Sequence, residues 1–318
     1  MIEERPTRDG YGEALLELAR TNPRVVVLDA DLSRSTRTEW LAQKYPDQFI
    51  NCGIAEQNMI GMAAGLAYCG LIPFATTYAI FIGRAYDQIR QALAFSQSNV
   101  KVVATHSGLA ASHDGGSHQG IEDIALMRVI PEMTVLSPAD YHQTRQAVFA
   151  AARHQGPVYI RLQKEPVPIL TPAQAPFEIG KASLMRLGGD VALLSTGSLL
   201  ADTLAAADRL ALQGLAAAVV NVSTIKPLDF DLLSVVLRQT GCAVTIEEHS
   251  VYGGLHEAVL ALAAAKGICL QAVAPIAILD QFGQTGEWHT LRAAYGLSSE
   301  AIFHAAMRVA SSKKQSPA

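Results

Sequence analysis

Two stretches of the sequence carry side chains that could do chemistry, and the first surrounds Glu56. This residue stands just before a helical pattern that ends near Gly70, and no charged residue occurs from position 60 to position 83. A carboxylate beside so apolar a region is costly unless a partner donates a proton to it or shares one with it. The spacing leaves two alternatives open: a functional carboxylate, or a first-turn glutamate stabilised by the helix dipole.

The second stretch is a glycine-rich segment that contains His106, His113, Asp114 and His118. It follows an apolar run at 101–105, and loops at the carboxyl ends of parallel strands are where ligands bind in α/β folds. A neutral imidazole that can also become charged suits proton transfer at an alkoxide. Because the histidines lack helical spacing and no second carboxylate cluster accompanies them, we predict no metal ligands here.

Two further groups could line the same site. Tyr78, Phe81 and Arg84 recur at a spacing of three and would lie along one wall of a helix or turn. Ordinary core aromatics and a solvated arginine fit that spacing equally well. Arg161 and Lys164 follow another apolar run, where they can hold an anionic group or be surface charges.

Alternating strands and helices must position these side chains. Up to residue 162 we expect helices at 11–20, 38–45, 56–69, 81–96 and 139–154, and strands at 24–29, 49–51, 72–75, 101–105, 134–137 and 158–162. This alternation implies a parallel sheet covered on both faces. In the Glu56 helix, the periodicity predicts that Met59, Met62, Ala63 and Leu66 share one face.

A linker and a second, smaller α/β domain are expected beyond this point. Residues 164–177 are rich in proline and lack periodicity, so we place the first domain at 1–166, the linker at 167–184 and the second domain at 185–318. Within the second domain we expect strands at 191–195, 217–221 and 243–247 and helices at 199–213, 229–238 and 254–266. The polar end, residues 311–318, should be frayed.

Composition narrows the class of protein. The net charge is −4 and no basic run exceeds Lys313-Lys314, so we expect no nucleic-acid partner. Charged residues make up only 17% and hydrophobic residues 50%, which favours an oligomer whose subunits cover part of each other's surface. The uncharged run 60–83 contains Pro73 and four glycines, which argues against a membrane span.

The cysteines and the N-terminus bear on the compartment. The four cysteines are scattered without ligand-like spacing, at Cys52, Cys69, Cys242 and Cys269, and indicate free thiols in a reducing compartment. Glu3 and Glu4 stand where a signal peptide would carry basic residues. We therefore expect a cytoplasmic protein.

Several motifs resemble the transketolase family of thiamine-diphosphate enzymes, over roughly residues 8–305. The residues that carry this resemblance are Gly53-Ile54-Ala55-Glu56-Gln57 with Gly61-Met62-Ala63-Ala64-Gly65, Asp114-Gly115 with His118-Gln119, Ile130-Pro131-Glu132-Met133, and Ser137-Pro138-Ala139-Asp140. Two stretches of the second domain, 224–229 and 247–255, also resemble the transketolase C-terminal domain. The resemblance implies a parallel-sheet pyrimidine-binding domain followed by that domain, which in the family mainly serves assembly.

The resemblance also implies roles at the cofactor. Glu56 would hydrogen-bond the aminopyrimidine ring of thiamine diphosphate and so promote loss of the proton from C2 of its thiazolium ring. Phe81 would stack on the pyrimidine with Tyr78 beside it, and Asp31 matches a family position near the cofactor.

On the substrate side, the resemblance implies that His118 and Asp114 bind hydroxyls of a ketose, with His118 catalytic alongside Glu56, and that His106 lies towards the phosphate. Arg84 stands where transketolases often have a third aromatic residue. Lys164 replaces an arginine of several members, and a lysine is the less specific anion clamp. The expected substrate-binding residues are His106, Asp114, His118, Arg84, Arg161 and Lys164.

The chain resembles only half of a transketolase, because the Gly-Asp-Gly motif of the diphosphate-binding domain does not occur in it. We therefore expect a split enzyme, in which a separate subunit supplies the diphosphate site and the Mg²⁺ ligands, in a heterotetramer that transfers a two-carbon ketol unit between sugar phosphates. Two alternatives are the β subunit of a 2-oxo-acid dehydrogenase and a non-catalytic partner of a thiamine enzyme. Asp114 and His118 favour the sugar enzyme over the dehydrogenase.

Overall fold

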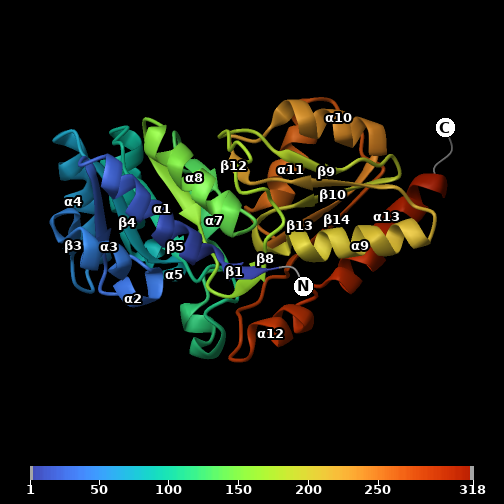
Figure 1. Cartoon of the computed structure of the whole chain (residues 1–318). Coiled ribbons are helices and arrows are strands. Elements are labelled where there is room, and N and C mark those ends of the chain that lie inside the picture. Colours follow the sequence, from blue (N-terminus) through green and yellow to red (C-terminus); the bar gives the residue numbers. More distant parts are fainter. Residues whose placement is uncertain (1–2, 316–318) are drawn as a thin grey trace.

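Runs of buried valine, leucine and isoleucine form the central strands of two sheets in this α/β protein (Figure 1). The structure, a computed structural model, describes residues 3–315. Every residue of β5 (Lys101–Thr105) and of β10 (Val191–Ser195) is buried. Such continuous runs are typical of parallel strands that are covered on both faces.

The first sheet has seven strands in the order β12-β6-β7-β5-β4-β2-β3. Its members are β2 (Val25–Asp29), β3 (Phe49–Asn51), β4 (Ile72–Tyr78), β5, β6 (Thr134–Leu136), β7 (Val158–Arg161) and β12 (Thr224–Lys226). All pair in parallel except β12, which runs antiparallel to β6. Because β12 comes from the second half of the chain, this sheet joins the two halves.

Helices cover both faces of the first sheet. On one face, α1 (Thr7–Thr21) and α8 (Tyr141–Arg153) bury Tyr11, Leu15 and Val148 against the strands. On the other face, α4 (Glu56–Tyr68) buries Met59 and Ile60. The remaining helices here are α2 (Ser33–Thr36), α3 (Glu39–Lys44) and α7 (Asp123–Val129). A short antiparallel pair, β1 (Glu4–Pro6) and β8 (Pro166–Pro168), lies beside the start of α1.

The segment 81–96, predicted as one helix, is broken into four pieces. They are α5 (Ala79–Ile82), a 3₁₀ turn (Gly83–Ala85), α6 (Tyr86–Gln88) and a π-helix (Ile89–Phe95). The preceding strand is longer than the predicted 72–75, because β4 continues to Tyr78. These two differences place Tyr78 at the end of a strand and Phe81 in the first turn after it.

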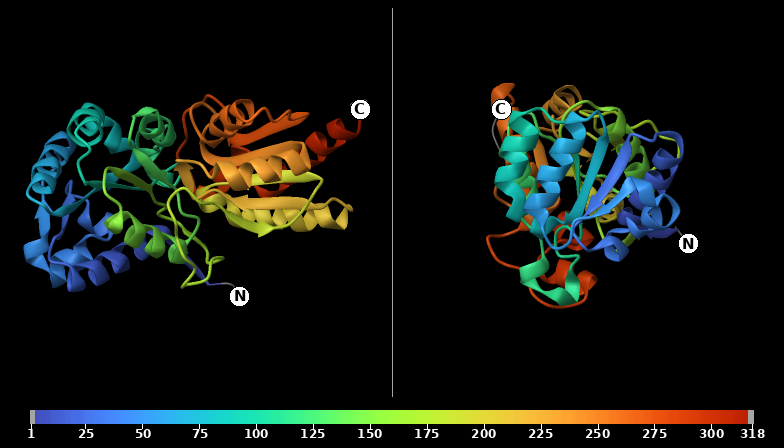
Figure 2. Two further views of the ribbon diagram at one scale, coloured as in Figure 1. Left: turned by 90° about the horizontal axis from the view of Figure 1, so that it is seen from above. Right: turned by 90° about the vertical axis from the view of Figure 1, so that its left-hand side faces the viewer.

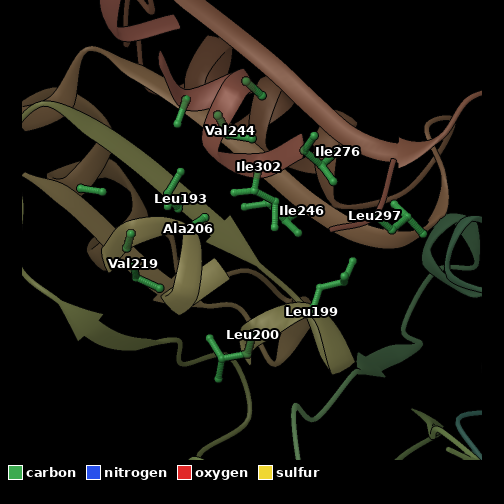
Figure 3. Packing of buried hydrophobic residues seen from close by; sticks show 14 of the residues in the cluster. Leu193, Leu199, Leu200, Ala206, Val219, Val244, Ile246, Ile276, Leu297 and Ile302 are labelled. Atoms are coloured by element: carbon green, nitrogen blue, oxygen red, sulfur yellow. The ribbon is translucent and has the colours of Figure 1, made fainter. Parts of the chain in front are cut away.

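The second sheet has the order β14-β13-β10-β11-β9. Its strands are β9 (Ser183–Arg186), β10, β11 (Ala217–Asn221), β13 (Cys242–Ser250) and β14 (Ala272–Ile278), and only β9 is antiparallel. Helices α9 (Leu200–Leu212) and α13 (Ser299–Gln315) cover one face, where Leu193, Val219, Val244 and Ile302 pack together (Figure 3). Helices α10 (Phe230–Thr240) and α11 (Leu255–Ala265) cover the other.

The α/β architecture with two mostly parallel sheets is as predicted, and four strands, at 49–51, 101–105, 191–195 and 217–221, have the predicted bounds. The helices and strands that were not predicted are β1, β8, β9, β12, β14, α2, α7, α12 (Trp288–Ala294) and α13. Residues 311–315 continue α13 instead of fraying, whereas 316–318 lie outside the described residues.

The two halves of the molecule lie side by side (Figure 2). Besides β12, the ammonium of Lys226 ties them together, because it donates hydrogen bonds to the carbonyls of Arg128 (2.9 Å) and Ile130 (2.5 Å). None of the helices between residues 3 and 315 is long and apolar enough to cross a membrane.

Candidate active site

Five strands of the first sheet end at one edge, and a side chain proposed from the sequence follows each of them. Along this edge the order is Lys164 after β7, His106 after β5, Tyr78 at the end of β4, Asp31 after β2 and Glu56 after β3. Adjacent strands lie about 4.8 Å apart, so four spacings separate the ends of this row by roughly 19 Å. The candidates therefore form an elongated site with Glu56 at one end and Lys164 at the other.

Glu56 is the first residue of α4 and its side chain turns towards the interior. The residue is only 5% exposed, and within residues 3–315 no side chain or backbone group donates a hydrogen bond to its carboxylate. Of the residues predicted to share one face of α4, Met59 and Ala63 are fully buried, whereas Met62 is 36% exposed. The carboxylate is thus held beside an apolar core with its hydrogen-bonding capacity unused.

A continuous row of four rings lies at the ends of β4 and β5, separated from Glu56 by the end of β2. The rings of Tyr78 and His106 stack with centroids 3.7 Å apart, and those of Tyr78 and Phe81 stack at 5.5 Å with an interplanar angle of 9°. The edge of His118 meets Phe81, with centroids also 5.5 Å apart. Residues at most 40 positions apart in sequence thereby build an aromatic wall suited to a flat heteroaromatic ligand.

His106 is buried in a positively charged environment. Its Nε2 lies 3.4 Å from Nη1 of Arg8 and its Nδ1 lies 2.9 Å from the Thr105 hydroxyl. An arginine can only donate, so we assign the proton of the neutral ring to Nδ1. Burial, together with the charges of Arg8, Lys164 and Arg37, lowers the pKa of His106 to about 2. The ring is therefore neutral at physiological pH.

Arg8 is a candidate binding residue that the sequence analysis missed. It lies in the first turn of α1, and its Nη1 also donates to the carbonyl of Ser35 at 2.8 Å. Its Nε is buried without a hydrogen-bond partner among the described residues. Burial and the charge of Arg37 lower the Arg8 pKa. Lys164 and Arg37 add positive charge around His106, although Arg37 is paired with Asp9 at 2.6 Å. Arg8 and Lys164 are therefore the cations that suit an anionic ligand group.

The segment 108–119, which we call the site loop, closes over the row. Its ends are joined by a β-bridge between Ser107 and Gly120 and by a 2.8 Å hydrogen bond from the Gly108 amide to the Gly120 carbonyl. Asp114 is exposed and His118 is half-buried. Because His118 touches Phe81, the loop places both of its predicted substrate-binding residues near the aromatic wall.

Arg161, predicted to bind substrate, is instead committed to contacts within the chain. It is 5% exposed, its Nε donates to Asp123 at 2.8 Å and its Nη2 donates to the Glu248 carbonyl at 2.8 Å. Two features of β7 explain this: the strand is central in the sheet, and Arg161 is its last buried residue. Lys164, whose side chain is half-buried and whose ammonium lies 3.6 Å from the Glu165 carboxylate, is the other cation at this strand end.

Two other predicted residues lie at the surface. Arg84 is exposed in the 3₁₀ turn after α5. Asp31 is exposed with a left-handed backbone (φ 63°) and accepts a hydrogen bond from Asn51 at 3.0 Å. The buried aspartate of this stretch is Asp29, which accepts from the hydroxyls of Thr36 and Thr38. Asp29 therefore holds the loop after β2, while Asp31 remains free to face a ligand or a partner.

No metal centre is built by this part of the chain. Between residues 3 and 315 there is no group of three or more histidine, cysteine, aspartate or glutamate side chains that could hold a metal ion.

Comparisons with known proteins identify the family of this chain. Residues 3–168 match the family model "Transketolase, pyrimidine binding domain" and residues 180–302 match "Transketolase, C-terminal domain". Among curated relatives, a Methanocaldococcus jannaschii protein provisionally named a transketolase C-terminal section is 43% identical and 93% of each chain is covered. The "6-deoxy-6-sulfo-D-fructose transketolase subunit SqwH" of a Clostridium species is 40% identical over 98% of this chain and 97% of the relative.

Solved structures extend the comparison. A structure described as "Split gene transketolase, inactive beta4 tetramer" superposes with a TM-score of 0.89 at 43% identity, over 98% of this chain and 100% of the other. The Campylobacter jejuni transketolase has a TM-score of 0.79 at 22% identity, over 95% of this chain and 46% of the larger one, and shows a shared fold. The chain thus belongs to the transketolase family and corresponds to its pyrimidine-binding and C-terminal domains, the C-terminal section of a split transketolase.

Proposed function

We propose that this chain is the pyrimidine-binding subunit of a split transketolase that moves a two-carbon ketol unit from a ketose to an aldose. The observation that carries this proposal is the order of groups along the carboxyl edge of the first sheet. A buried carboxylate, an aromatic wall, a loop with Asp114 and His118, and a cationic end follow one another. A ring cofactor needs the carboxylate and the aromatic wall. A hydroxylated, anionic substrate beside it needs the loop and the cationic end.

The family implies thiamine diphosphate, and the residues at one end of the row fit its aminopyrimidine. Glu56 offers a carboxylate that is 5% exposed and free of intramolecular donors, and such a group gains most from a ligand N–H. The Phe81 and Tyr78 rings offer the stacking surface. When bound, thiamine diphosphate supplies the nucleophilic carbon that carries the ketol unit. Glu56 holds the ring and polarises it, and Asp31 lies at the same edge.

The other end of the row supports a substrate with a terminal anion. His106 is neutral and holds Arg8 through Nε2, while Arg8 and Lys164 supply charge. The relative from Clostridium carries a sulfonated sugar in its name, so sulfonate and phosphate are both anions of the class we propose. Asp114 and His118 would bind hydroxyls between this end and the cofactor, with Arg84 at the rim.

A second kind of subunit completes the proposed enzyme. Residues 3–315 contain no group of three or more histidine, cysteine, aspartate or glutamate side chains that could hold Mg²⁺, and the Gly-Asp-Gly motif of the diphosphate-binding domain does not occur in the sequence. Helix α4 and the residue before its N-cap offer such a subunit an exposed surface next to Glu56. This surface is made of Ile54 (83% exposed), Met62 (36%) and Tyr68 (72%), with Gly61 and Gly65 between them. Exposed apolar side chains around glycines allow another chain to approach the backbone closely. We propose a heterotetramer in the cytoplasm.

The experiment is an assay of this chain, alone and mixed with a diphosphate-binding subunit from the same source, with ketose phosphates, a sulfonated ketose, pyruvate and branched 2-oxo acids. We expect ketol transfer from an anionic ketose by the mixture only. Turnover of 2-oxo acids without sugar turnover would instead support a dehydrogenase. A complex that forms and turns over none of these donors would support the non-catalytic role.

A further inference from the structure

We propose that the C-terminal domain positions the substrate-binding side of the active site through two positioning residues. Glu248 of that domain holds the first end of the site loop, and Gln119, at the second end of the loop, bonds to the segment 280–287. The inference rests on the proposed function for its kinetic part only. It assigns a role in sugar binding to a domain that the sequence analysis connected only with assembly. The contacts that carry it lie at the two ends of the site loop, residues 108–119.

The first end of the loop sits on Glu248 of β13. The Leu109 amide donates to Oε1 of this carboxylate at 2.8 Å, and the Trp288 indole donates to the same oxygen at 3.0 Å. A side chain at Gly108, whose φ is 65°, would meet Glu248 Oε1 at 2.5 Å. Glu248 is 2% exposed and Arg292 lies 3.8 Å from its other oxygen. Because the buried Glu248 carboxylate has these hydrogen-bond partners, it fixes the backbone at Leu109, from whose amide it accepts.

The second end is held by the segment 280–287, which we call the C-terminal strap. In Figures 1 and 2 the strap and α12 lie against the site loop. The Gln119 side chain, 2% exposed, donates from Nε2 to the Gln284 carbonyl at 2.9 Å. Gly116 approaches the strap so closely that an added Cβ would lie 2.6 Å from the Gly283 carbonyl oxygen. Gln119 thus links the strap to His118, its neighbour in sequence.

Position 283 is the point at which this contact can be tested. A Cβ added to Gly283 would lie 1.6 Å from Oε1 of Gln119, and the backbone there does not have the left-handed conformation that would itself exclude alanine. Alanine at 283 must therefore push the Gln119 carboxamide away and break its bond to the strap. A displacement of about 1 Å at a positioning contact can reduce turnover up to about a hundredfold.

The experiment compares the wild-type complex with Gly283→Ala, Glu248→Gln and Gly283→Ala/Gln119→Ala, with Gly189→Ala as the matched control. The Cβ at 189 would meet only Gln239 at 3.7 Å, an ordinary contact. We expect Gly283→Ala to speed amide hydrogen exchange in residues 108–119 at least about fivefold and to raise KM for the ketose about tenfold. Affinity for thiamine diphosphate and Tm should match those of the control.

The double variant separates the contact from a general loss of stability. Because Gln119→Ala removes the atom that collides, we expect the effects of the two substitutions to be non-additive, with the double variant less impaired than their sum. Wild-type exchange and KM in Gly283→Ala would overturn the inference, as would faster loop exchange with an unchanged KM. A parallel loss of cofactor affinity would also overturn it, because the effect would then not be confined to the sugar side.

The two proposals fail separately. If the wild-type complex turned over no sugar, the proposed reaction would be wrong, and loop exchange in Gly283→Ala would still decide whether the strap holds the loop. If the complex transferred ketol units and Gly283→Ala did so with wild-type KM, only the positioning role would be lost.

Discussion

At the scale of single residues, Glu56 and His106 differ in the number of contacts that the chain itself makes with their side chains. Glu56 is buried without an intramolecular donor, whereas His106 is engaged by Arg8, Thr105 and the ring of Tyr78. The first arrangement leaves a carboxylate available to a ligand. The second keeps an imidazole neutral in a cationic pocket.

Glu56→Gln in the assembled complex should lower kcat for ketol transfer by about 10²-fold or more, because an amide accepts a hydrogen bond but cannot take a charged role. Glu39→Gln is a matched control, since Glu39 is likewise the first residue of a helix. Steady-state kinetics with a ketose donor and an aldose acceptor measure the difference. Equal activity of the two variants would show that Glu56 serves only its helix.

Arg8→Gln should raise KM for an anionic ketose by about 10- to 100-fold, in line with the loss of one charge-assisted hydrogen bond. A neutral ketose should show little change. Arg24→Gln is the control, because Arg24 is exposed and lies just before β2, at the opposite end of that strand from the row. A similar loss with the neutral sugar would mean that Arg8 holds the fold and not the anion.

His106 predicts a pH dependence of stability. The folded-state pKa is lowered to about 2, below the ordinary value of 6.5, so between these values the unfolded chain binds a proton that the folded chain does not. The unfolding free energy should therefore fall as pH drops below 6.5, by up to about 1.4 kcal/mol per pH unit from this group. Urea denaturation at pH 7, 6 and 5 should show a shallower decline for His106→Asn, and parallel declines would contradict the assignment.

At the scale of elements, the residue that caps α8 also binds the start of the predicted linker, 167–184. The Asp140 carboxylate caps α8 through the Gln143 amide and also accepts from both the amide and the hydroxyl of Thr171, at 2.6 and 2.7 Å. Residues 169–171 are thereby fastened to the domain that precedes them. The proline-rich stretch read as a linker is thus bound to the surface at its start.

Asp140→Ala should lower the unfolding free energy by about 2–4 kcal/mol, because it removes a cap and leaves buried donors unpaired. Asp229→Ala is the comparison, because the Asp229 carboxylate caps α10. This carboxylate accepts hydrogen bonds from the amides of Leu232 and Ala182, each at 3.1 Å. We expect about 1–2 kcal/mol there. Equal losses in chemical denaturation would show that the bonds to Thr171 contribute little.

The sequence predicts a strand well when the strand is a continuous buried run, and poorly when the strand is short or lies at a sheet edge. Strands β5 and β10 are continuous apolar runs with polar ends, so periodicity and length identify them. Strand β14 contains Pro275, which is compatible with a strand only at a sheet edge, and β12 has three residues and pairs out of chain order. Neither has a local signal.

The same limit applies to the site. Glu56, Phe81 and His118 stand in local motifs, and the sequence could single them out. Arg8 lies 98 positions from His106 and is brought to it only by the fold. The partner of Arg161 could not be predicted either, because Asp123, to which it donates a hydrogen bond, lies on the unpredicted helix α7.

At the scale of the whole molecule, buried charges join the two halves. Arg161 pairs with Asp123 and donates to the Glu248 backbone of the second sheet, and both members of the pair are almost fully buried. Burial raises the cost of removing either one, because the other charge is left uncompensated.

Asp123→Ala should therefore lower the unfolding free energy by about 3–5 kcal/mol. The exposed pair of Arg145 and Glu17 offers a control, and Glu17→Ala should cost no more than about 1 kcal/mol. Both are measured by urea denaturation of the full chain. Similar small losses in the two variants would indicate that water or a neighbouring group compensates Arg161.

Strand β12 sets a rule for any exchange of domains between relatives of this protein. It completes the first sheet by pairing with β6, yet it is encoded after β9, β10 and β11 of the second sheet. A chimera joined at residues 169–182 would bring a foreign β12 against the host's β6, and a truncated first domain would expose that edge to other chains. Exchange of domains should succeed only when β6 and β12 come from the same parent protein. The two halves of this chain therefore have to be exchanged as one piece.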